Sequence, residues 1–368
     1  MDITTLSTAA RRFPLLGRPR PACPSQSERV TEIAEIVCAA EAPGADGMAE
    51  AAHALNKTAL LASDCGLTAY ARDLCWQHID VYRVARSRLS VLQARYMLEP
   101  VVNLARLQIR ADAGGQALQL LKAMYQAVMA NTDLAVDGRT LPLANLTGTR
   151  QEHHKLREWV WRQCLEDGIR ALTLAGRWDA AVTHAQTYRG IGVHLMEGRQ
   201  AAIVAPCLRG ALQTARAMLQ ESTPTQPWEK QVASCLTVMC AGPNGGSSSR
   251  DIAMMVACFL GQEPVPGYAV FRARLGLTVV TLAGADSDVG DRVLARVATE
   301  VIEAGDGYAA RDVLGYPDTS KSLTDAQREA LSRLVICSGL GSGTLPEPLL
   351  NSLTNSVQVA KKTLAASM

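Results

Sequence analysis

Aromatic residues and lysine are scarce in this chain of 368 residues. Phe, Tyr and Trp make up 4% of it, and only seven of its 37 basic residues are Lys. Neither sign of charge dominates, because 35 Asp and Glu nearly balance the 37 Lys and Arg and leave a net charge of +2. The charged residues are spread along the sequence. The sequence has no basic block and no convincing helix-turn-helix segment, so we expect no direct binding of nucleic acid.

Long apolar runs are also missing. No stretch reaches the roughly 18 apolar residues that a membrane-spanning helix needs. The best runs, 253–260 and 275–283, have the length of core helices. Arg11 and Arg12 precede a short segment rich in Pro and Arg rather than the apolar region of an export signal. We therefore expect no membrane partner.

The ten cysteines form no CxxC pair, and most of them lie inside apolar, periodic stretches. A free cysteine in such surroundings behaves as a small hydrophobic residue. A chain of this length with 48% apolar residues needs no disulfides to build a core. The sequence thus predicts reduced thiols and a cytoplasmic location. Abundant Ala, Gly and Leu, with Arg in place of Lys, are typical of a high-GC bacterial genome such as an actinobacterial one.

Hydrophobic periodicity predicts an all-α protein. Apolar residues recur at spacings of three and four over most of the chain, and the strict alternation of strands is missing. The predicted organisation has four parts. They are a flexible leader (1–28), a helical repeat region (29–240) with a polar insert near 131–150, a Gly/Ser-rich linker (241–250) and a C-terminal helical region (251–368). Near the C-terminus, Thr324 and Gln327 have the spacing of a capping box.

The segment ALTLAGRWDAAVTHA, residues 171–185, resembles the turn of a tetratricopeptide repeat. Gly176 relaxes the turn, Trp178 packs across it, and Ala181 and Ala185 let two antiparallel helices approach closely. Weaker copies occur at 54–75 and 104–121, and a further one has its glycine 34 residues beyond Gly176, the repeat length of that family. Other spacings are longer. The resemblance implies stacked antiparallel helix pairs, an irregular tetratricopeptide-like α-solenoid; a generic helical bundle is the alternative.

In such repeats the first helix of each pair lines a concave surface. The resemblance therefore implies a ligand or peptide groove that includes Asn56, Arg106, Arg110, Glu166 and Arg170. Arg106 and Arg110 are one helical turn apart and would form a clamp for a carboxylate or phosphate. The alternative is that both are solvated helix charges.

Catalytic motifs are weak. The sequence has no GxSxG, no Walker loop and no GxGxxG that opens a helix. His153 and His154 are the densest pair of potential ligands, but neighbours on a helix point about 100° apart and do not easily share one metal ion. They are candidate catalytic residues only if the chain is an enzyme. We expect neither a metal nor another cofactor.

Two hypotheses follow. The first is a non-catalytic helical-repeat scaffold that binds a protein or peptide, with a regulatory role as one form of it. The second is an enzyme or a small-molecule-binding accessory protein of specialised, antibiotic-type metabolism, with its site near the insert 131–150 and the helix 152–161 that follows it. A scaffold predicts a groove with exposed Arg and Asn, and an enzyme predicts a deep pocket with a His or carboxylate of perturbed pKa.

Overall fold

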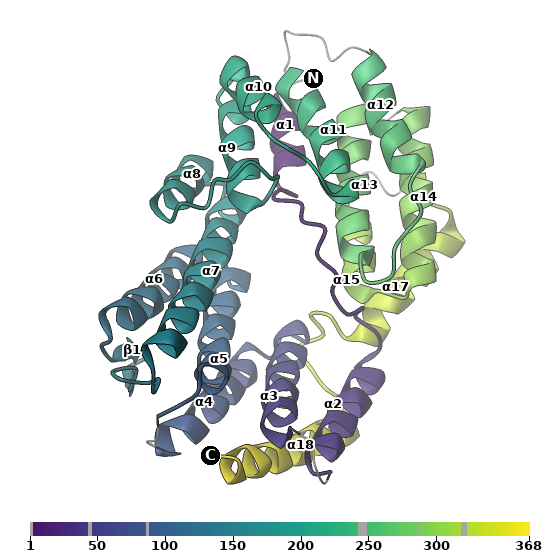
Figure 1. Ribbon diagram of the computed structural model, residues 1–368. Coiled ribbons are helices and arrows are strands. Elements are labelled where there is room, and N and C mark those ends of the chain that lie inside the picture. The colour runs from purple at the N-terminus through teal and green to yellow at the C-terminus, as the bar shows by residue number, and fades with distance from the viewer. Residues whose placement is uncertain (1–2, 43–45, 86–87, 242–248, 286, 318–321) are drawn as a thin grey trace. The chain divides into compact units, whose positions relative to one another are not determined.

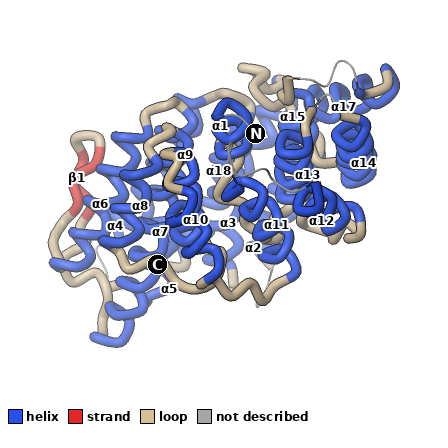
Figure 2. Tube along the Cα trace, turned by 90° about the horizontal axis from the view of Figure 1, so that it is seen from above, coloured by secondary structure: helices blue, strands red, loops and turns tan. Residues whose placement is uncertain are grey.

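Helices make up nearly all regular structure in the described part of the chain (Figure 2). The computed structural model describes residues 3–368 apart from 43–45, 86–87, 242–248, 286 and 318–321. Among these residues, two three-residue strands, β1 (Leu134–Val136) and β2 (Arg139–Leu141), pair as an antiparallel hairpin. The predicted all-α class is confirmed, and the solenoid arrangement stays a prediction.

Two units divide the chain, and each combines segments that are distant in sequence. Unit 1 contains residues 1–24 and 172–338, and unit 2 contains residues 25–171 and 339–368. This division differs from the one expected at the linker 241–250. Residues 242–248 of that linker lie outside the described residues, and the helices on both sides of it belong to unit 1. The expected C-terminal region is split, because its last helix belongs to unit 2.

Unit 2 is a series of long helices in which neighbours along the chain pack together (Figure 1). Its helices are α2 (Gln26–Ala40), α3 (Gly47–Asp64), α4 (Thr68–Ala85), α5 (Val91–Arg110), α6 (Gly114–Ala130), most of α7 (Arg150–Leu174) and α18 (Glu347–Ala366). The C-terminal helix α18 packs against α2, α3 and α4. Ser25 and Ser90 begin α2 and α5 as capping boxes, which satisfy amides that a helix start leaves without partners.

Helices α3, α5 and α7 run parallel to one another. Asn103 of α5 donates a hydrogen bond to Asn56 of α3, and Arg110 donates one to Ser63. In both pairs the residues are 47 positions apart in the sequence. A constant separation means that both helices run in the same direction. Arg106 of α5 contacts Asp167 and Arg95 contacts Trp159, so α7 has the same polarity as α5. The intervening α4 and α6 return the chain between them.

The motif at residues 171–185 forms the turn that its sequence predicts. Helix α7 ends at Leu174, and α8 (Trp178–Thr187) begins after three intervening residues. Gly176 has a φ of 69°, a conformation that glycine adopts without strain. Ala181 and Ala185 are fully buried, and α8 packs against α9.

Unit 1 is built around α13 (Ala269–Ala283), which is buried on nearly every side. Around it pack α1 (Ile3–Ala10), α11 (Pro227–Ala241), α12 (Ser249–Leu260), α14 (Asp288–Ala304) and α15 (Gly307–Leu314). The remaining helices of the unit are α8, α9 (Glu197–Leu208), α10 (Leu212–Gln220) and α17 (Asp325–Ser338). The predicted capping box before α17 is present, since Thr324 and Gln327 exchange side-chain and backbone hydrogen bonds.

The first residues of the chain differ from the expected leader. The sequence predicts a flexible segment over residues 1–28, but residues 3–10 form α1 and α2 already begins at Gln26. Phe13 and Leu15 are 3% and 2% exposed, respectively. Pro and Arg hide the periodicity of this segment, while its apolar side chains bury against helices far along the chain.

All ten cysteines are free thiols, and seven of them are buried. No described helix is long and apolar enough to span a bilayer.

Candidate functional site

A cavity of about 590 Å³ opens in unit 2 between α3, α5 and α7. The three parallel helices each present one face to it. The residues that line it from α3 and α5 recur at helical spacing, because residues three and four apart share a face. The polar ones are Glu50, His53, Asn56, Lys57, Ser63, Glu99, Asn103, Arg106 and Arg110.

Three of the five groove residues expected from the sequence meet in this cavity. Asn56, Arg106 and Arg110 line it. Glu166 and Arg170 are not among its lining residues; Glu166 is half-buried and Arg170 is exposed, and both take part in interactions within the fold. The predicted groove residues of α3 and α5 therefore lie in one cavity, and the two predicted residues of α7 lie outside it.

Arg106 and Arg110 are each anchored by a buried carboxylate. Asp167 accepts from Nε of Arg106 at 3.2 Å and from its Nη2 at 2.9 Å. Asp64 lies 3.0 Å from Nη1 of Arg110 and 2.6 Å from Nη2 of Arg29. These pairs fix the two guanidinium groups one turn apart but also neutralise part of their charge, so the clamp is weaker than two unpaired cations would make it.

Both arginine side chains nevertheless remain partly exposed. The Arg106 side chain is 44% exposed, and that of Arg110 is 39% exposed. A guanidinium carries five N–H donors. Asp167 engages only Nε and Nη2 of Arg106. An acceptor on a ligand can therefore still bind to Arg106.

A chain of hydrogen bonds joins Glu99, Asn56 and Asn103 on the cavity wall. Asn56 Nδ2 donates to Glu99 Oε2 at 2.8 Å, and Asn103 Nδ2 donates to Asn56 Oδ1 at 3.1 Å. Burial raises the pKa of Glu99, while the nearby Arg95 and the bond from Asn56 act in the opposite direction. The wall thus combines one partly desolvated carboxylate with amides in fixed positions.

Glu99 and Asn103 were not among the residues expected from the sequence. A signal for them exists, since Glu99, Asn103, Arg106 and Arg110 follow one another at spacings of four, three and four. Four polar residues at this spacing occupy one stripe of a helix. The alignment with a tetratricopeptide repeat predicts only the two arginines of that stripe as groove residues.

Apolar side chains complete the wall. Leu60, Tyr96, Leu107 and Trp159 line the cavity, and Leu60 remains 41% exposed. Trp159 comes from α7, and its ring lies 5.7 Å from the Arg95 guanidinium. A surface of this kind offers contact area as well as hydrogen bonds.

The two histidines of the catalytic hypothesis lie in the first turns of α7, and neither lines the cavity. His154 is exposed, and burial followed by the charge of Arg157 lowers the pKa of half-buried His153. Their neighbour Glu152 accepts from the Thr149 backbone at 3.1 Å, as at an ordinary helix start. In the described part of the chain, no group of three or more His, Cys, Asp or Glu is placed to hold a metal ion.

The insert near 131–150 carries the β1–β2 hairpin, which docks on α4. Asp137 accepts from Trp76 Nε1 at 3.2 Å and pairs with Arg72 at 2.7 Å. A second cavity of about 440 Å³ lies beside the insert, and its described lining includes two arginines and a tyrosine but neither a histidine nor a carboxylate. Tyr82, Arg83 and Arg88 are the titratable residues of this described lining.

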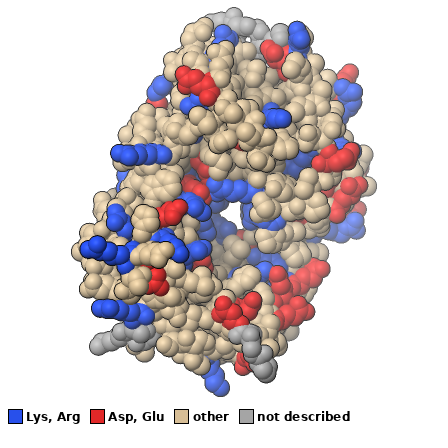
Figure 3. Space-filling view, viewed as in Figure 1, with Lys and Arg blue, Asp and Glu red and all other residues tan. Residues whose placement is uncertain are grey.

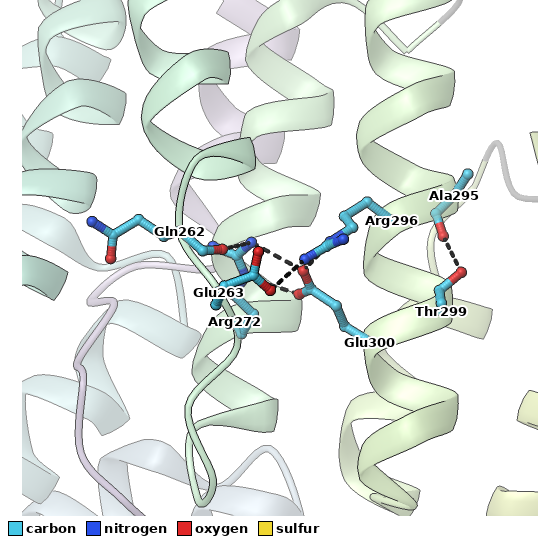
Figure 4. A network of polar contacts seen from close by, with 7 residues as sticks. All are labelled: Gln262, Glu263, Arg272, Ala295, Arg296, Thr299 and Glu300. Atoms are coloured by element: carbon cyan, nitrogen blue, oxygen red, sulfur yellow. Dashed lines mark hydrogen bonds and ion pairs between the residues drawn. The ribbon is translucent and has the colours of Figure 1, made fainter.

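Unit 1 contains a buried ion-pair network (Figure 4). Arg272 and Glu300 of this network also line a cavity of about 360 Å³. Arg272 of α13 donates from Nε to Glu300 of α14 at 2.8 Å and from Nη2 to the backbone oxygen of Gln262 at 3.0 Å. Arg296 also donates to Glu300, at 2.6 Å. Arg272 and Glu300 are both buried, so the network joins α13 to α14 in a region of low dielectric constant.

Fold and site define the class of this protein as an all-α protein with a polar cavity on three parallel helices. No protein-family model, no curated protein and no solved structure matches the chain. On the face shown in Figure 3, basic and acidic side chains occur side by side.

Proposed function

We propose that the chain is a non-catalytic helical scaffold and that the cavity between α3, α5 and α7 binds an extended segment of a protein partner. The observation that supports this proposal most is a row of polar side chains held in place along the cavity wall. It consists of Asn56 of α3 and of Glu99, Asn103, Arg106 and Arg110 of α5. The tetratricopeptide resemblance and a bacterial, cytoplasmic setting belong to the same proposal, as does a regulatory role.

Amide side chains suit a peptide backbone, because each offers both a donor and an acceptor. Asn103 and Gln163 line the cavity from two different helices. An extended peptide that lies across these helices can bond to both amides while its side chains contact Leu60 and Trp159. The partly exposed side chains of Arg106 and Arg110 favour an acidic side chain on the peptide.

A peptide library displayed on phage tests this proposal, because it samples many sequences and does not require the partner to be identified first. Panning on the purified chain should enrich peptides that carry Asp or Glu, and their binding should fall when Asn103 is replaced by Ala. Enrichment of peptides that bind the Asn103→Ala variant equally well would contradict the proposed site.

A small-molecule-binding accessory protein, or an enzyme of specialised metabolism, is the second candidate. One observation favours it: the cavity has the size of a ligand site and contains Glu99, a carboxylate whose pKa burial raises. Native mass spectrometry of the chain purified from its own cells discriminates the two. A bound small molecule that is lost in the Glu99→Gln variant favours the second candidate.

A further inference from the structure

Residues 11–24 cross unit 1 as an extended segment with an unusual composition. From residue 15 onward they form neither helix nor strand, and the purple chain that leaves α1 in Figure 1 is this segment. It contains four Arg and four Pro and no acidic residue. Proline restricts such a chain to extended conformations, so little entropy is lost when it docks.

The backbone of the segment is held in the manner of a bound peptide. The side-chain oxygen of Gln200, on α9, accepts a hydrogen bond from the Leu15 amide at 2.7 Å, and its Nε2 donates to the Leu15 carbonyl at 2.7 Å. Further along, the Arg20 amide donates to the Gly267 carbonyl at 2.9 Å. The Cys23 amide donates to Asp306 at 3.2 Å, and the Cys23 carbonyl accepts from the Gly307 amide at 2.9 Å. Residues of α9, of the turn at Gly267 and of the start of α15 thus form hydrogen bonds with the segment backbone at three separate points.

The side chains of the segment meet complementary groups. Arg18 pairs with Glu197 at 2.8 Å, and the Glu197 side chain is largely buried. The Arg20 guanidinium lies 4.3 Å from the centre of the Tyr308 ring, a distance that gives a cation–π interaction. Arg12 lies 5.1 Å from the Tyr316 ring.

The middle of the segment passes directly against Trp228. A Cβ atom at position 17 would lie 2.2 Å from Cγ of Trp228, so only glycine fits there without displacing the indole. Two apolar anchors, Phe13 and Leu15, are buried in the residues before it. Glycine, two anchors and flanking arginines define a recognition pattern.

We propose that this face of unit 1, made by α9, α11 and α15, is a binding site for an extended segment rich in Arg and Pro. The chain's own residues 11–24 are its resident occupant. A partner protein that carries such a segment binds by displacing them. The acidic and aromatic groups of the site provide the charge complementarity, and none of its residues belongs to the cavity proposed in unit 2.

The resident segment leaves part of its site empty. The cavity of about 360 Å³ is lined by Arg20 and Ala22 of the segment and by Val265, Val297 and Val301 opposite. The cavity also contains charged side chains, among them Arg272 and Glu300, so a partner segment with Leu in place of Ala22 would place its larger apolar side chain against the valines. We expect a peptide with the Ala22→Leu change to bind about five-fold more tightly than the natural sequence.

The test uses a fluorescein-labelled peptide of residues 11–24 and the full chain. Arg18→Glu/Arg20→Glu weakens the resident segment at two exposed positions and leaves its apolar anchors in place. We expect this variant to bind the peptide about ten-fold more tightly than the wild-type chain, because apparent affinity rises with the fraction of vacant sites. The matched control Arg250→Glu/Arg292→Glu changes two exposed arginines elsewhere in unit 1 and should bind like the wild type. A peptide with Gly17→Val should not bind.

A second form of the chain covers the case in which the charge changes prevent folding. A protease site inserted after Pro24 and cut after folding leaves residues 1–24 attached without a covalent bond. The labelled peptide should then exchange with the resident segment while the helical circular-dichroism signal persists. The proposal is overturned if neither form binds the peptide, or if cutting the segment abolishes the helical signal, since the segment would then be a structural part of the core.

Discussion

Asn103 donates a hydrogen bond to Asn56, and Asn56 in turn donates to Glu99, so the two asparagines orient a partly desolvated carboxylate of the cavity. The bond places a donor and an acceptor from two parallel helices side by side. It also fixes which face α3 and α5 present to the cavity. The polar row of the proposed binding site depends on this contact.

Replacement of Asn56 by Ala should raise the pKa of Glu99 further. Burial already raises this pKa, and the Asn56 amide opposes the rise because it donates to the charged form. A carbon-13 NMR titration of the Glu side chains measures the change directly. The matched variant Asn131→Ala, an exposed asparagine outside the cavity, should leave the Glu99 titration where it is. A Glu99 pKa that falls or stays constant in Asn56→Ala would contradict the contact.

Asp64 should be a major determinant of the stability of unit 2. It is buried and pairs with Arg29, which is also largely buried, and with the more exposed Arg110. Asp64→Asn leaves the buried Arg29 without its counter-charge and should lower the free energy of unfolding by about 3 kcal/mol. Arg110→Met removes only the exposed partner and should cost about 1 kcal/mol or less. Urea unfolding followed by circular dichroism compares the two variants, and equal losses would show that the burial difference has no energetic consequence.

The buried pair in unit 1 allows a rescue experiment. Glu300→Gln should destabilise the fold by about 3 kcal/mol, because Arg272 stays buried without its carboxylate. The double variant Arg272→Met/Glu300→Leu removes both charges and should recover most of this loss. Arg296 keeps Glu263 as an exposed partner in the double variant. Thermal unfolding should rank the wild type and the double variant above Glu300→Gln; a double variant less stable than the single one contradicts this account.

Stability should fall with pH below about 6.5 because of His78. Both nitrogens of this fully buried ring have no hydrogen-bond partner among the described residues, and burial lowers its pKa to about 3. The unfolded chain therefore binds a proton that the folded chain does not. Stability is complete above the unfolded pKa of about 6.5 and is lost as pH falls toward the folded value, at about 1.4 kcal/mol per unit. Between pH 7 and pH 5, His78 should account for a loss of about 2 kcal/mol.

The variant His78→Leu isolates this contribution. Its free energy of unfolding should depend less on pH by about the same 2 kcal/mol between pH 7 and pH 5. Urea unfolding of the wild type and of His78→Leu at the two pH values gives the four free energies of unfolding that the comparison requires. An unchanged pH dependence in His78→Leu would show that the ring is protonated in the folded protein.

Local features of the fold could be predicted from the sequence. The helical class follows from periodicity, and the turn before Trp178 and the capping box of Thr324 with Gln327 follow from residue types at fixed spacings. Arg106 and Arg110 meet in one cavity because residues four apart share a helix face. These features depend on contacts within a few residues.

Contacts between distant residues could not be predicted in the same way. In α7, Asp167 contacts Arg106, whereas the predicted Glu166 does not line the cavity. Neighbouring residues point about 100° apart around a helix, so an alignment that is wrong by one residue predicts the wrong side chain for the cavity. Leu15 docks on Gln200, which is 185 residues away, and a composition rich in Pro and Arg gives no sign of that partner. The division into two units depends on such contacts as well.

The most direct test of the proposed binding site compares two leucines. Leu60 and Leu92 are both 41% exposed on helices of unit 2, but only Leu60 lines the cavity. The measurement is the dissociation constant, by fluorescence anisotropy, of a library-selected peptide for the wild type, Leu60→Glu and Leu92→Glu. Leu60→Glu should weaken binding about ten-fold or more, corresponding to about 1.4 kcal/mol, while Leu92→Glu should bind like the wild type. Equal affinities for the two folded variants would contradict the proposed binding site.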